Sequence, residues 1–180
     1  LSHGANEEYC LLVREELLKF CPDLEWNDDL VDAAQNSDDL LSLGTNLETL
    51  CRALLKITKD LRLYSSGSKG GFGQISLPKI INGSSFYTSK SNPTIPETVI
   101  QCCFQVLGLC RTAAYSSEHA ELDLNIYEST AVINLYDATK ILTSGITLLN
   151  NHCLSELEVN VGRCNELAKF AAKEDPQLKP

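Results

Sequence analysis

The chain contains no methionine, not even at its first position. We therefore expect the printed sequence to be a processed or partial chain. Its first six residues also lack the charged and apolar regions of a secretory signal peptide. No apolar run approaches the roughly eighteen residues that predict a membrane span. The sequence therefore predicts no membrane partner.

Basic residues are in the minority, with 15 lysines and arginines against 24 aspartates and glutamates and a net charge of −9. This balance argues against non-specific nucleic-acid binding, which needs a basic face. It is compatible with a small anionic ligand, because one lysine in a cleft can outweigh distant surface carboxylates.

The eight cysteines form no CxxC motif, and the three histidines show no zinc-ligand spacing. Most of the cysteines lie among apolar residues, as in Cys102-Cys103 and at Cys110. This pattern is typical of buried, reduced thiols in an intracellular protein, cytoplasmic or mitochondrial. It predicts no metal site.

Apolar residues recur at helical spacing over most of the chain, with no strand alternation and no internal repeat. In the longest helical segment the leucines lie close to a heptad seam. Long helices need partners along their length, so we predict an all-α, long-helix bundle that is shared between subunits. The predicted helices span 7–20, about 37–64, about 96–117, about 124–150 and about 155–173.

The helical pattern ends between residues 65 and 96, where glycines and prolines break it. A loop of about thirty residues is far longer than usual in a compact domain, and such loops are mostly functional or disordered. It contains the sequence Gly-Ser-Ser-Phe-Tyr-Thr-Ser-Lys-Ser-Asn-Pro, residues 83–93.

The side chains of this loop are suited to binding a carboxylate. A Gly-Ser-Ser turn offers hydroxyls and backbone N–H groups to an anion. Lys90 is a point cation, and Asn92 can donate a hydrogen bond to the same group. Composition alone favours a solvated flexible linker over a binding loop.

Residues 83–93 resemble the signature G-S-S-x-M-P-x-K-x-N-P of the fumarase/aspartase superfamily, with Tyr87 and Thr88 in place of Met-Pro. Gln74 replaces a glutamate in a second, G-E-I-x-L-P-like stretch. The resemblance covers nearly the whole chain, corresponds to the C-terminal half of the family, and is strongest to its aspartate ammonia-lyase branch. The other matching stretches, in the family's order, are Ile57–Gly67, Phe72–Pro78, Asn92–Glu97 and Ser117–Asn125.

This resemblance implies a lyase that deaminates aspartate to fumarate and ammonia with no metal and no organic cofactor. In the family, the first serine of the signature removes the proton beside a carboxylate, and that position is Ser84. Lys90 and Asn92 would bind the substrate carboxylate, assisted by Ser85. Glu97 stands where the family has a glutamate that pairs with a histidine of another subunit.

The family is homotetrameric and builds each site from three regions on three subunits. The chain would be one piece, 1–180, of the central helical domain (about 1–64 and 97–154) and the start of the C-terminal region (about 155–180), with the signature loop at 65–96. The other two site regions, a Thr/Ser-rich stretch and a histidine motif, do not occur here. Other chains would supply them, including a second chain that carries the N-terminal half.

Two alternatives stay open. The replacements at Tyr87 and Thr88, together with the two missing site regions, are compatible with a non-catalytic scaffold or oligomerisation module derived from this fold. Within the enzyme hypothesis, the sequence does not decide between aspartate, malate and another succinyl substrate.

Overall fold

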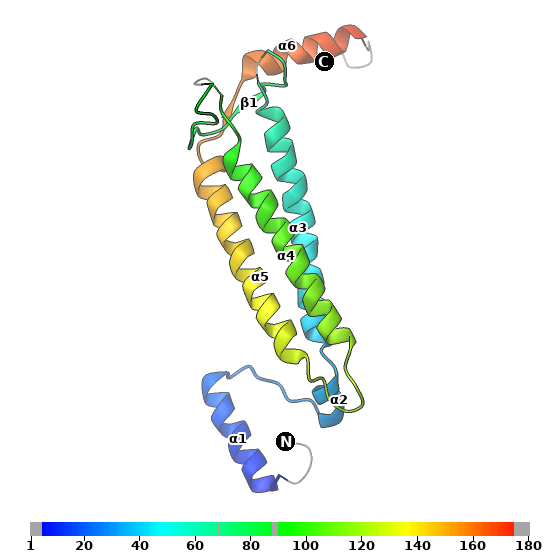
Figure 1. Ribbon diagram of the computed structural model, residues 1–180. Helices are drawn as coiled ribbons and strands as arrows, with labels where there is room; N and C mark the ends of the chain where they lie inside the picture. Colours follow the sequence, from blue (N-terminus) through cyan, green and yellow to red (C-terminus); the bar gives the residue numbers. More distant parts are fainter. Residues whose placement is uncertain (1–4, 68, 88–89, 175–180) are drawn as a thin grey trace.

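A computed structural model describes residues 5–67, 69–87 and 90–174. Three long helices, α3 (Asp38–Tyr64), α4 (Thr94–Glu118) and α5 (Glu128–Leu149), lie side by side as an up-down-up bundle (Figure 1). The signature loop joins α3 to α4 at one end, and a short turn joins α4 to α5 at the other. The predicted all-α bundle is confirmed. None of the described helices is both long and apolar enough to cross a membrane.

Two shorter helices precede the bundle, and both are capped as their sequences suggest. The side chain of Asn6 accepts the Glu8 N–H at 2.9 Å at the start of α1 (Glu7–Phe20). Asp29 caps α2 (Leu30–Gln35) in the same way. Neither helix contains a buried residue, so the core belongs to α3, α4 and α5.

The core is built mostly from small and medium-sized side chains, which let the helices approach closely. A Cβ on Gly145 of α5 would lie 3.5 Å from the Cys102 Cβ of α4, and one on Gly44 of α3 would lie 3.4 Å from Leu135 Cδ2. Dense packing of this kind excludes water and supplies the main favourable term in folding. The central buried residues are Cys51, Leu54, Val99, Cys103, Val106, Cys110, Ala113, Ala131, Leu135, Ala138, Leu142, Leu149 and Cys153.

Helix α3 carries two apolar stripes, each repeating every seven residues. The inner stripe packs against the core, and its members are Leu40, Leu47, Leu54 and Leu61. The outer stripe stays 43–45% exposed, and its members are Leu43, Leu50, Ile57 and Tyr64. Alternating three- and four-residue spacing between the stripes is the pattern of a coiled-coil seam. Leu43, Leu50 and Ile57 of this stripe therefore stay partly open to solvent among the described residues, whereas the Tyr64 ring meets the Phe72 ring edge to face, with the centroids 6.2 Å apart.

The last two predicted helices begin later than expected. Helix α5 begins at Glu128 rather than near residue 124, because residues 121–124 form a tight turn in which Leu122 has a positive φ of 56°. Helix α6 (Val161–Glu174) begins six residues after the predicted residue 155.

The delay before α6 has two causes. The end of α5 continues as a π-helical turn, η1 (Asn150–Leu154). The short strand β2 (Glu158–Val159) then pairs antiparallel with β1 (Ile75–Ser76) inside the signature loop. Strands of two residues are too short for alternation in the sequence to predict.

Asn125 connects four segments at the α4–α5 end of the bundle. It is 4% exposed, and its amide nitrogen donates to Ser37 Oγ at 3.2 Å and to the Ser116 carbonyl at 3.1 Å. Its side-chain oxygen accepts the Tyr127 N–H, and its own N–H donates to the Ala34 carbonyl. The family-like stretch marks Asn125 as a candidate for orienting the signature loop or a neighbouring subunit, and the hydrogen bonds observed here lie at the α4–α5 end of the bundle.

Replacing Asn125 by alanine leaves several buried polar groups without partners, so we expect a loss of about 2–3 kcal/mol in the free energy of unfolding. Urea unfolding followed by circular dichroism measures it. Asn134→Ala is the control, because Asn134 makes one exposed bond within α5. Equal effects of the two substitutions would contradict the connecting role of Asn125.

All eight cysteines are free thiols, and Cys51, Cys103, Cys110 and Cys153 are buried. Burial, reinforced by the neighbouring Cys103, raises the pKa of the Cys51 thiol from 9.0 to about 12. Burial is also the main cause of the raised pKa of Cys103, Cys110 and Cys153. The folded chain thus favours the neutral form of these thiols, whereas the same thiols ionise near pH 9 in the unfolded chain.

The buried thiols should therefore make their full contribution to the free energy of unfolding below about pH 9. That contribution should be lost progressively as the pH rises toward 12, because only the unfolded state releases these thiol protons in that window. Denaturant unfolding at a series of alkaline pH values measures the decline. Cys51→Ala should make it shallower, whereas Cys21→Ala, at an exposed position, should leave it unchanged. An identical decline in both variants would rule out Cys51 as its source.

Candidate active site

The signature loop folds back on itself as a small hairpin. Asn82 and Ser91 form an antiparallel bridge, and the Gly83 N–H donates to the Lys90 carbonyl at 3.0 Å. Lys90 N–H donates in turn to the Tyr87 carbonyl at 3.0 Å. The tip, including Thr88, lies outside the described residues. The hairpin brings the Gly-Ser-Ser turn and the Lys-x-Asn stretch to the same place.

Gly83 is required by the close approach of the two arms. A Cβ at this position would lie 2.8 Å from the Lys90 carbonyl oxygen and 3.1 Å from Asn92 Oδ1. Contacts this short to backbone are not tolerated without movement, so a larger residue would open the hairpin. The glycine that begins the signature is thus explained by packing.

Ser84 is half-buried, and its hydroxyl oxygen accepts two backbone N–H groups. These belong to Phe86, at 3.1 Å, and Tyr87, at 3.2 Å. Two amide donors aimed at one oxygen stabilise negative charge on it. The turn therefore favours negative charge on the Ser84 oxygen.

The other predicted binding residues flank Ser84. Ser85 and Lys90 are exposed, so their side chains are free to meet a ligand. Asn92 is half-buried and lines a cavity of about 190 Å³, together with Ser65, Ser76 and Ser91. Its carbonyl accepts the Thr94 N–H at 2.8 Å, which connects the hairpin directly to the first turn of α4.

Glu97 lies in that first turn of α4 and faces the last turn of α3. Its Oε1 lies 3.5 Å from Nε of Arg62, and both side chains are partly exposed. An acidic group at a helix start and a basic group at a helix end both favour their helix dipoles. The sequence analysis did not identify Arg62, although it lies within one of the family-like stretches.

The structure thus gathers Ser84, Ser85, Lys90 and Asn92 in one hairpin and puts Glu97 at the start of the adjoining helix. No metal-binding group of three or more histidine, cysteine or acidic side chains occurs among the residues described. Phe86 is 90% exposed, so the hairpin forms one open wall of a site. Its assignment as a catalytic site stays a prediction.

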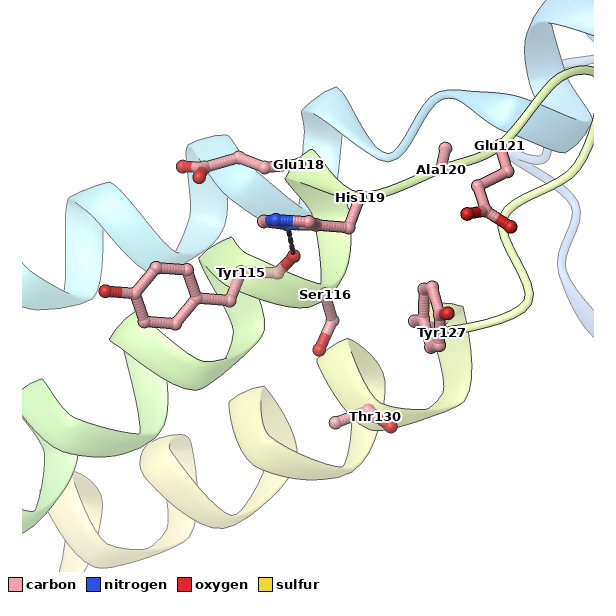
Figure 2. Close-up of a pocket in the computed structure, with 8 residues that line it drawn as sticks. All are labelled: Tyr115, Ser116, Glu118, His119, Ala120, Glu121, Tyr127 and Thr130. Carbon is pink, nitrogen blue, oxygen red and sulfur yellow. Dashed lines mark hydrogen bonds between the residues drawn. The ribbon is translucent and has the colours of Figure 1, made fainter.

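A larger hollow, of about 710 Å³, lies at the opposite end of the bundle (Figure 2). His119 lines it. The Nδ1 of the His119 ring donates to the Tyr115 carbonyl at 2.7 Å, and this hydrogen bond holds the imidazole at the end of α4. Glu118 and Glu121 also line this hollow. The 25 residues of α4 separate it from the hairpin by about 35 Å, so the two do not form one site within a chain.

Gly83→Ala should break the hydrogen bond that closes the hairpin, because the new Cβ meets backbone at 2.8 Å. Amide hydrogen exchange at residues 83 and 90 should accelerate by about tenfold or more. Gly70→Ala is the matched control, since nothing lies within 4 Å of a Cβ there. Unchanged exchange in the Gly83 variant would show that the hairpin does not depend on this contact.

Comparison with known proteins gives the family. The sequence model of a family described as Lyase matches residues 2–108. Aspartate ammonia-lyase of Bacillus subtilis is 36% identical over 145 residues, which are 81% of this chain and 30% of that protein.

Solved structures agree. Fumarate lyase:delta crystallin from Brucella melitensis, bound to cobalt, matches 92% of this chain and 36% of its own, with a TM-score of 0.86 and 34% identity. Class II fumarase from Schistosoma mansoni matches 93% of this chain and 37% of its own, with a TM-score of 0.77 and 25% identity. The chain spans about a third of the length of these relatives. It belongs to the Lyase family, the fumarase/aspartase superfamily.

Proposed function

We propose that this chain carries the proton-abstracting region of an ammonia-lyase that converts aspartate to fumarate and ammonia. The observation that carries the proposal is the Ser84 oxygen, which accepts two backbone N–H groups in a hairpin shared with Lys90 and Asn92. Membership of the family gives the reaction class, a fumarase/aspartase-type lyase.

The reaction begins when the C–H bond next to one substrate carboxylate breaks. Ser84 acts as its alkoxide, having first given its own proton to solvent. The substrate proton then passes to Ser84 Oγ and forms the neutral hydroxyl, and the electron pair moves into that carboxylate. A serine is a weak base, so the N–H groups of Phe86 and Tyr87 assist by stabilising its oxygen as an anion. The C–N bond then breaks, ammonia leaves, and the double bond of fumarate forms.

The carboxylate that receives the electron pair gains negative charge, and stabilising this charge is the main catalytic task. Lys90 offers a cation, while Asn92 and Ser85 offer hydrogen-bond donors from the same hairpin. Interactions that strengthen as the charge develops lower the barrier more than equal binding of substrate would. We assign these three residues to the substrate carboxylate.

Glu97 has a separate assignment. It lies in the first turn of α4 rather than in the Gly-Ser-Ser turn, and its carboxylate lies partly exposed beside Arg62. We propose that it pairs with a histidine from another subunit, as the family resemblance implies. The remaining substrate contacts would come from other copies or from a second chain with the N-terminal half.

The apolar surface of the bundle supports this assembly. The outer stripe of α3 presents four large side chains at seven-residue spacing, each 43–45% exposed. Surfaces of this length and regularity are typical of helix–helix interfaces. We propose an intracellular homotetramer in which this chain is the second half of the central helical domain and the start of the C-terminal region.

Two alternatives differ from this proposal in substrate or in activity. Similarity to a class II fumarase makes malate the other candidate substrate. The outer stripe and the altered loop residue Tyr87, which is 71% exposed, are compatible with a scaffold without activity.

The decisive variant is Ser84→Ala. In the assembly isolated from its natural source, we expect fumarate formation from aspartate, followed by its ultraviolet absorbance, to fall by about a thousandfold or more because the base is gone. Ser117→Ala is the control, since its hydroxyl only donates to Ala113 near the far end of α4.

Native mass spectrometry of the same sample gives the subunit composition. If the assembly forms fumarate from malate but not from aspartate, malate is the substrate. An assembly of this chain that is silent with both substrates would reject the enzyme and leave the scaffold.

A further inference from the structure

The C-terminal segment is hydrogen-bonded to the glycine-rich turn, residues 71–76, that precedes the signature hairpin. Arg163, in the first turn of α6, donates from Nε to the Phe72 carbonyl at 3.0 Å and from Nη2 to the Gly71 carbonyl at 3.4 Å. Its Nη1 also pairs with Glu166 at 2.8 Å. The Arg163 side chain is only 23% exposed, although it begins a surface helix.

Further contacts join the same two segments. The Asn160 N–H donates to the Gln74 carbonyl at 2.8 Å, and the Cys164 thiol lies 3.7 Å from that oxygen. Strand β2 pairs with β1 immediately beyond. The residues from Gly71 to Ser76 are therefore bonded to a segment that lies about ninety residues later in the chain.

The same glycine-rich turn is also hydrogen-bonded to the end of α3. Phe72 N–H donates to Ser66 Oγ at 3.0 Å, and Gln74 N–H donates to the Tyr64 carbonyl at 2.8 Å. Gly73 between them has a positive φ of 58°, which suits glycine. The direction in which the chain leaves this turn is therefore set on both sides.

The turn and the hairpin meet across the 190 Å³ cavity. Ser76 lines it from the Gly71–Ser76 segment and Ser65 from the end of α3, while Ser91 and Asn92 line it from the hairpin. A shift of the turn would thus change one wall of the cavity whose other wall is Asn92.

We propose that Arg163 is a positioning residue, which sets the place of the signature hairpin from the C-terminal segment through the Gly71–Phe72 carbonyls. Arginine suits this task because its planar guanidinium reaches three acceptors in fixed directions, whereas a lysine ammonium is a single flexible point charge. The effect on catalysis rests on the proposed lyase function; the effect on the hairpin does not.

The experiment compares Arg163→Gln, Arg163→Lys and Glu166→Gln in the full chain by amide hydrogen exchange. Arg163→Gln should accelerate exchange by about tenfold in residues 71–76 and in the hairpin residues 82–87 and 90–92. Helices α3 to α5 should exchange as before. Glu166→Gln removes the ion pair but leaves both carbonyl bonds, so the hairpin should exchange as in the parent.

Kinetics of the natural assembly supply the second readout. Because Asn92 is assigned to the substrate carboxylate, Arg163→Gln should raise KM by about tenfold with a smaller fall in kcat, and Arg163→Lys should restore part of the loss. A purely structural residue would instead lower the amount of active enzyme and leave KM unchanged.

Two results would overturn the inference. One is acceleration confined to residues 71–76 with an unchanged hairpin, and the other is uniform acceleration through α3 to α5. A parent assembly without lyase activity, but with the expected exchange pattern, would reject the proposed function and support the positioning role of Arg163.

Discussion

The packing of α4 between α3 and α5 is the constraint on which the rest of the structure depends. This one helix contributes buried residues to both neighbours along its length, from Ile95 to Ala114. Its first turn receives the signature hairpin through Asn92 and Thr94. Its last turn offers the Ser116 carbonyl to Asn125. A rigid central helix therefore fixes the positions of two features about 35 Å apart.

A catalytic group gains from such support because small errors in position cost much of the rate. The hairpin is exposed and depends on few contacts of its own, of which the Gly83–Lys90 hydrogen bond is central. Its precision comes from neighbours, namely α4 on one side and the turn fastened by Arg163 on the other. This arrangement suits the role proposed for the loop, which is to orient Ser84 while it admits a substrate.

The local sequence predicted the elements whose signals are local. Helical periodicity gave α1 at its observed bounds and α3 within one residue. The Gly-Ser-Ser and Lys-x-Asn spacing pointed to one site, and the hairpin does bring these residues together. The misses were contacts between distant segments: β1 with β2, Arg62 with Glu97, and Arg163 with Phe72. No periodicity encodes such pairs, because each depends on how the whole bundle ends.

The outer stripe of α3 has a thermodynamic consequence. A bundle that leaves half of a heptad seam exposed is an incomplete hydrophobic unit, so a partner helix laid on Leu43, Leu50 and Ile57 would add its association free energy to that of folding. Stability then becomes a function of concentration as well as of sequence. Dilution that separates such a partner would lower the stability of the chain by the association free energy.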